Sequence, residues 1–187
     1  MGPWIWSGEV GYEIYLRDGS RGGDLWERVM EAGKPHGIAP TGPSDIRRIE
    51  AGILNYGIDM TLDDNPYEVG LAWMVNPKKT TDFVGREALR RIAAEGPKRK
   101  LVGLEIAGDP LDLNMAPWSV AANGRKIGQV TSAVYSPRLK KNIGYAMVPI
   151  AHAADGTKLV VTTPAGEAPA TVVPRPFVDP DKDVPKG

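Results

Sequence analysis

The sequence predicts an α+β fold in two parts. Before Gly96, helix-spaced apolar residues and helix-capping signals occur together with one strand-like run. After Gly96, short β-like runs recur between turn signals, which is typical of an antiparallel sandwich or barrel. A chain of 187 residues is long enough for one large domain or two small ones. We therefore expect two domains, residues 1–96 and 97–187.

The composition excludes several classes of function. The 23 basic and 23 acidic side chains give zero net charge, which argues against nucleic-acid binding through a basic excess. No cysteine is present, so disulfides, thiol nucleophiles and zinc–thiolate sites are excluded. The two histidines, His36 and His152, are far apart, and a His-rich metal site is not expected. No apolar run approaches the roughly 20 residues of a membrane span, and we expect a soluble cytoplasmic protein.

The first predicted element is a strand at residues 8–16, GEVGYEIYL. Tyr12, Ile14 and Leu16 alternate with Glu13 and Tyr15, which is the period of a strand. Glu13 and Tyr15 are therefore expected on one face. A turn is predicted next, at residues 18–20.

Three helices are expected after this turn. The first has Asp24 and Glu27 as a capping box and ends at Gly33. The second starts near Ser44, carries an apolar stripe with Arg47, Arg48 and Glu50 off it, and ends by Gly57. The third spans residues 82–96. Between them, Asn65-Pro66 has the signature of a helix start, and residues 71–75 are expected to be a buried strand or helix core.

The second part contains five β-like runs, at residues 100–106, 126–135, 143–150, 158–163 and 170–174. Asn123-Gly124 predicts a type I′ hairpin turn. The residues from Asp179 to the end are rich in proline and charge and are expected at the surface.

Common catalytic and phosphate-binding signatures are missing from the sequence. No G-x-G-x-x-G follows a strand, and no P-loop or G-x-S-x-G elbow is present. The acidic stretch at residues 59–65 does not fit a calcium loop, which needs alternating ligands followed by glycine. We interpret its carboxylates as helix-capping groups and predict no metal site.

Glu13 is the most suggestive single residue. On an open sheet face its carboxylate is simply solvated. On a covered face it must be paired or accept strong donors. A flat ligand with adjacent N–H and NH₂ groups, such as a pterin or a guanine, suits it because two parallel hydrogen bonds provide both energy and orientation.

Long ordered motifs connect the chain to a known family. GEVGYEIYL, LWERVMEAG, DIRRIEAGILNYGIDMTLDDNPYEVGLAWMV and DFVGREAL resemble the aminomethyltransferase family, which includes the glycine-cleavage T-protein and folate-dependent demethylases. Further on, GQVTSAVYSPRLKKNIGYAMVP resembles that family's C-terminal β-barrel. NYGIDMTLDDNP looks closer to the dimethylsulfoniopropionate demethylase branch. The resemblance implies the C-terminal part of a folate-binding α+β domain followed by a jelly-roll-like antiparallel barrel.

The resemblance also implies a cofactor site for tetrahydrofolate. Glu13, in the GYE motif, is expected to hold the pterin ring, with Tyr15 on the same face. Arg175 and Lys182 correspond to a C-terminal segment that approaches the folate in the family. Ser44 stands where T-proteins have an arginine, which puts the T-protein's own substrate in doubt. Ser44 is expected to cap its helix instead.

The family's catalytic aspartate lies in an N-terminal half to which nothing here corresponds. The leading hypothesis is therefore an incomplete tetrahydrofolate-dependent aminomethyl or methyl transferase with no assigned catalytic residue. The alternatives are a non-catalytic folate-binding or scaffold subunit, and an inactive fragment. The expected partners are reduced folate, a separate N-terminal-half polypeptide, a lipoyl carrier protein, or a second copy of the chain through an unpaired strand edge.

Three further features keep two interpretations each. Arg138, Lys140 and Lys141 form either a surface for an acidic carrier or polyglutamate tail, or a solvated face. Tyr56 and Trp73 either stack on a pterin or pack in a core.

Overall fold

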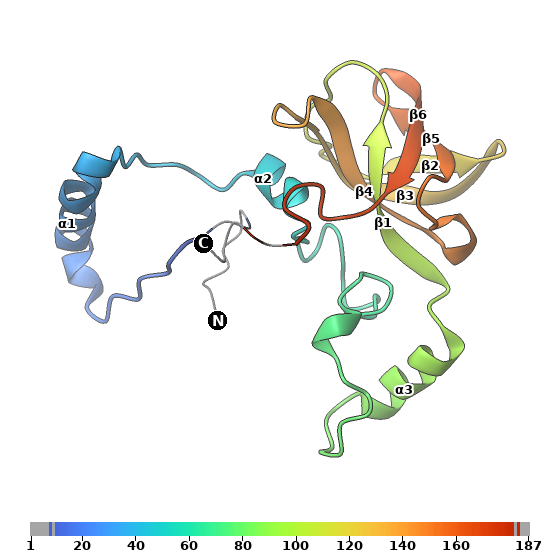
Figure 1. Ribbon diagram of the computed structural model, residues 1–187, viewed down its shortest axis with the longest axis horizontal. Coiled ribbons are helices and arrows are strands. Elements are labelled where there is room, and N and C mark those ends of the chain that lie inside the picture. The colour runs from blue at the N-terminus through green and yellow to red at the C-terminus, as the bar shows by residue number, and fades with distance from the viewer. Residues whose placement is uncertain (1–7, 9, 182, 184–187) are drawn as a thin grey trace.

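The computed structural model describes residues 8, 10–181 and 183. Its second part is a closed antiparallel barrel, which confirms the predicted β-architecture (Figure 1). The strand order around the barrel is β1-β4-β3-β2-β5-β6, and β6 closes it by pairing with β1. The strands are β1 (Arg99–Ile106), β2 (Trp118–Ala122), β3 (Arg125–Ser136), β4 (Lys141–Pro149), β5 (Lys158–Thr163) and β6 (Gly166–Val173).

The barrel is closed around an apolar interior. Val120, Val130 and Val161 are fully buried there, in a cluster that draws on all six strands. Burying one such side chain contributes roughly 1.5–3 kcal/mol. The β2–β3 connection is the predicted type I′ turn, since Asn123 and Gly124 both have positive φ, at 50° and 73°.

The first part contains three α-helices and several 3₁₀ turns. The α-helices are α1 (Gly22–Gly33), α2 (Asp45–Glu50) and α3 (Arg86–Glu95). The 3₁₀ turns of this part are η1 (Gly19–Arg21), η2 (Lys34–His36) and η3 (Ala72–Met74). A further 3₁₀ turn, η4 (Ile150–His152), lies in the connection between β4 and β5. In Figure 1, α1 and α3 stand apart from the barrel, whereas α2 lies against it.

The predicted strand at residues 8–16 is wrong for the part that is described. Val10 forms a single β-bridge, and residues 11–16 form neither strand nor helix. The alternating pattern is present, but a strand also needs a neighbouring strand to take its backbone hydrogen bonds. Tyr12, Ile14 and Tyr15 are consequently exposed.

The capping predictions have mixed outcomes. Ser44 caps α2 as expected, accepting a hydrogen bond from the Arg47 N–H at 3.4 Å. Asp24 is not a cap, because α1 begins two residues earlier and Asp24 pairs with Arg21. Asn65 accepts from the Tyr67 and Glu68 N–H groups at 3.1 and 3.2 Å, but the residues after it form a turn and not a helix.

Residues 71–75 are not the expected buried core. They form η3 within a loop, and the side chains of Trp73 and Met74 are 80% and 64% exposed. α2 is also shorter than predicted: it ends at Glu50, ahead of Gly52, which has a φ of +77°.

A second hydrophobic cluster joins the two parts of the chain. Ile49 of α2 and Val69 pack with Leu101, Ile143 and Tyr145 of the barrel. The division into domains 1–96 and 97–187 therefore stays a prediction, since residues on both sides share one core.

A buried ion pair lies at the same junction. Asp59 is fully buried and accepts from Arg48 Nη1 at 2.7 Å, Thr131 Oγ1 at 2.7 Å and Ser132 Oγ at 2.6 Å. The Asn55 N–H supplies a further hydrogen bond at 2.9 Å. Arg48 and Glu50, which fall off the apolar stripe in the sequence, are buried here, and Glu50 accepts from Ser136 Oγ.

We expect Asp59→Asn to lower the free energy of unfolding by about 3 kcal/mol, because it leaves the buried Arg48 guanidinium incompletely compensated. Urea denaturation followed by circular dichroism measures the change. The matched control is Asp109→Asn, at an exposed aspartate, for which a change within about 0.5 kcal/mol is expected. Equal unfolding midpoints for the two variants would contradict a structural role for the ion pair.

Candidate functional site

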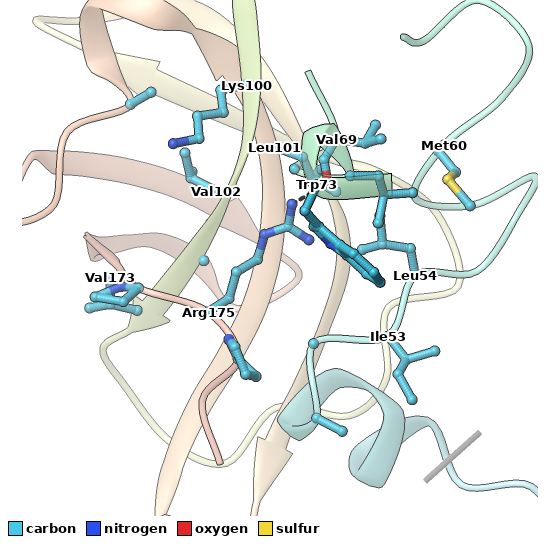
Figure 2. Close-up of a pocket in the computed structure, with 18 of the residues that line it drawn as sticks. Ile53, Leu54, Met60, Val69, Trp73, Lys100, Leu101, Val102, Val173 and Arg175 are labelled. Carbon is cyan, nitrogen blue, oxygen red and sulfur yellow. Dashed lines mark hydrogen bonds between the residues drawn. The ribbon is translucent and has the colours of Figure 1, made fainter. Parts of the chain in front are cut away.

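A cavity of about 720 Å³ lies where the loop after α2 meets the barrel (Figure 2). Its walls come from four stretches of chain: residues 51–73, β1, the β4–β5 connection, and the end of β6 with the segment that follows it. Most of the lining is aliphatic, including Leu54, Val69 and Leu101. A volume of this size is within the range of small-molecule sites, which are mostly apolar with a few polar groups.

Arg175 is the most distinctive polar group of the cavity. Its Nη2 donates to the Val69 carbonyl, and its guanidinium lies 5.6 Å from the ring centroid of Tyr145. Within the described part of the chain it forms no ion pair with a carboxylate. Burial lowers the pKa of Arg175, and the nearby Tyr145 and Asp59 act in the opposite direction.

Tyr145, which no pattern in the sequence singles out, connects Arg175 to the rest of the fold. Its hydroxyl donates to the Ile49 carbonyl at 2.8 Å, and its ring stacks on Phe177 with centroids 6.1 Å apart. Burial raises the pKa of the Tyr145 phenol well above its usual range. The only signal in the sequence is a tyrosine within a strand.

The segment that carries Arg175 is fixed to the end of α2. The Phe177 and Val178 N–H groups both donate to the Glu50 carbonyl, each at 2.9 Å. Gly70 faces the guanidinium so closely that a β-carbon there would collide with it, and Gly70 has a φ of +78°. Glycine suits this position for both reasons.

Two more charged residues line the cavity, Lys100 from β1 and Asp155 from the β4–β5 connection. Both are exposed. Trp73 lines the same cavity as Arg175, and its indole is largely exposed (Figure 2). Trp73 is thus not the core residue considered from the sequence, and Tyr56, which is 61% exposed, is not one either.

Glu13 and Tyr15 lie elsewhere. Both are exposed on the extended segment before η1, and neither lines the cavity. The Tyr15 hydroxyl donates to the Glu13 carboxylate, and this hydrogen bond raises the pKa of Tyr15. Lys182 lies outside the described residues. Of the three predicted residues that the structure describes, Arg175 alone lines the cavity, and the folate roles of all four stay predictions.

The remaining predicted groups lie at the surface. Arg138, Lys140 and Lys141 are exposed, and Lys141 pairs with Glu105 at 2.8 Å. In the described residues, no cluster of three or more His, Asp or Glu side chains is arranged to hold a metal ion. Among the described helices none has the length and hydropathy needed to cross a bilayer.

Two family models match the chain, one on each side of residues 80–98. The GCVT N-terminal domain model matches residues 4–79, and the glycine cleavage T-protein C-terminal barrel domain matches residues 99–179. The cavity is formed jointly by these two matched regions.

Curated relatives match along most of the chain. An aminomethyltransferase of Symbiobacterium thermophilum is 41% identical over 174 residues, which is 92% of this chain and 46% of the relative. The dimethylsulfoniopropionate demethylase DmdA of Ruegeria pomeroyi is 39% identical over 167 residues, 89% of this chain and 45% of the relative. The chain thus spans about half the length of the curated relatives that it matches.

The fold is also similar to a solved structure. The crystal structure of the glycine cleavage system aminomethyltransferase T from Bartonella henselae superimposes with a TM-score of 0.82 and 28% identity, covering 94% of this chain and 48% of that one. Family models, relatives and fold agree, and the chain belongs to the glycine-cleavage T-protein (aminomethyltransferase) family.

Proposed function

We propose that this chain forms part of the site of a tetrahydrofolate-dependent one-carbon transferase. The observation that carries the proposal is the cavity between the two family-matched regions, with Arg175 directed into it. Its apolar walls suit a flat aromatic ligand, and its cations suit a ligand that also bears carboxylates. A reduced folate has both features.

The role of the protein in such a reaction is binding and orientation. When bound, the folate supplies the nucleophilic nitrogen that accepts a methyl or aminomethyl carbon. Glu13 and Tyr15, which lie outside the cavity lining, are proposed to hold the pterin, and Arg175 and Lys182 to approach the folate from the C-terminal segment. We assign no catalytic acid to the residues of this chain. The family's acid is proposed to come from a different part of the complete site.

A second candidate function is a non-catalytic folate-binding or scaffold subunit. It is favoured by the apolar side chains that are exposed before the barrel, on residues 10–16 and on α1, where Trp26 is 55% exposed. Contiguous exposed apolar surface marks interaction sites. The proposed occupants are a separate N-terminal-half polypeptide, a lipoyl carrier protein, or a second copy of the chain.

Isothermal titration of the chain with tetrahydrofolate tests the proposed function. We expect saturable binding, and we expect Glu13→Gln to weaken it by about 1 kcal/mol or more, because a charge-assisted hydrogen-bonding pair to the pterin is lost. The matched control is Glu27→Gln on α1, an exposed glutamate for which the affinity should not change. Absence of binding to the unsubstituted chain contradicts the proposal, and equal affinities of the chain and Glu13→Gln remove Glu13 from the site.

The isolated chain is expected to be a dimer or larger at micromolar concentration. Residues 11–16 have no strand partner and carry exposed apolar side chains, and a segment of this kind promotes self-association. Light scattering of the chain measures the mass, with Ile14→Lys expected to lower it towards that of a monomer. Ala107→Lys adds the same charge at an exposed barrel position and should leave the mass unchanged. A monomeric mass for the unsubstituted chain would rule out this mode of association.

A further inference from the structure

Arg175 forms no ion pair among the described residues. The guanidinium is partly withdrawn from water, which lowers its pKa, and the charge of Asp59 acts in the opposite direction without forming an ion pair with it. Asp155 lines the same cavity but is exposed, and Lys100 adds a second positive charge. Because a partly desolvated cation is stabilised by an anion that pairs with it, the cavity favours an anionic ligand.

The hydrogen-bonding capacity of Arg175 leads to the same class of ligand. A guanidinium has five N–H donors in a planar fork. One of its nitrogens donates to the Val69 carbonyl, and the others form no hydrogen bond with the described residues. The fork matches the two oxygens of a carboxylate.

The guanidinium is also held in a defined place. The Tyr145 ring lies 5.6 Å from it and is itself fixed by Phe177 on the ring and by the Ile49 carbonyl on the hydroxyl. Tyr145 is fully buried and cannot easily rotate away. An aromatic face attracts a cation, so the ring sets where the free donors point before any ligand arrives.

We propose that the cavity contains a carboxylate-binding subsite in which Arg175 binds the carboxylate and Tyr145 is a positioning residue for Arg175. The proposal rests on the proposed function for the identity of the larger ligand. Two sources supply the same chemistry: the glutamate end of a folate and a free small carboxylic acid. If Arg175 only anchors the Val69 carbonyl, substituting it should change the affinity for neither of these ligands.

The experiment compares tetrahydrofolate, 6-methyltetrahydropterin, which has no carboxylate tail, and propionate. If the folate tail is the source, Arg175→Met weakens the binding of tetrahydrofolate at least about tenfold. The same substitution then changes the affinity for the tail-free pterin by less than about twofold. If a free acid is the source, Arg175→Met leaves tetrahydrofolate unchanged and abolishes propionate binding, followed by NMR chemical shifts. Arg125→Met, an exposed arginine in β3 away from the cavity lining, is the matched control.

Two substitutions separate positioning from folding. Tyr145→Phe keeps the ring and loses the hydrogen bond to Ile49, so it should lower the unfolding midpoint but keep the affinity within twofold. Tyr145→Leu removes the aromatic face and should weaken the Arg175-dependent ligand several-fold. In the Arg175→Met background, Tyr145→Leu should have no further effect on that affinity. Additive losses in the double variant, or equal losses in the Phe and Leu variants, overturn the positioning role.

The outcomes distinguish the subsite from the proposed function. If Arg175→Met leaves the affinity for tetrahydrofolate unchanged and propionate does not bind, the subsite is contradicted and the proposed function is not. If propionate binds in a way that depends on Arg175 and tetrahydrofolate does not bind, the subsite is supported and the proposed function is contradicted.

Discussion

The buried ion pair between Asp59 and Arg48 is the constraint on which the rest of the site depends. Neither charge tolerates burial unless its hydrogen-bonding groups are paired. Asp59 meets that requirement with Arg48, Thr131 and Ser132, and the last two belong to β3. α2 is therefore held against the barrel at a fixed place. Without these contacts a helix of only six residues has little stability of its own.

The position of α2 then determines the position of Arg175. The last carbonyls of a helix lack partners within it, and here they accept hydrogen bonds from outside. The Ile49 carbonyl takes the Tyr145 hydroxyl, and the Glu50 carbonyl takes the N–H groups of Phe177 and Val178. The segment after β6 is thus attached to both the helix and the barrel. Arg175, two residues before Phe177, is directed into the cavity as a result.

The sequence is sufficient to predict the barrel but not the cavity. Alternating apolar residues and the Asn123-Gly124 turn encode β-structure locally. The Ser44 cap likewise encodes the start of α2 locally. Residues 11–16 fail because a strand depends on a neighbour that no local pattern supplies. Arg48 and Ser132 are 84 residues apart, and Tyr145 and Ile49 are 96 apart. Contacts at such separations leave no periodic signal, so neither Arg48 nor Tyr145 is recognisable in advance.

The net charge of zero is compatible with an Arg175 that has no ion-pair partner, because net charge acts over long distances and an ion pair acts over a few ångströms. Net charge describes the field around the whole molecule, which salt screens beyond about 10 Å. It therefore bears on long-range attraction of nucleic acid and not on a single desolvated group. Lys141 illustrates the contrast: it is solvated and paired with Glu105, so it needs no further anion. Arg175 is partly withdrawn from water, and no carboxylate among the described residues forms an ion pair with it. A local requirement of this kind distinguishes a binding site from a charged surface.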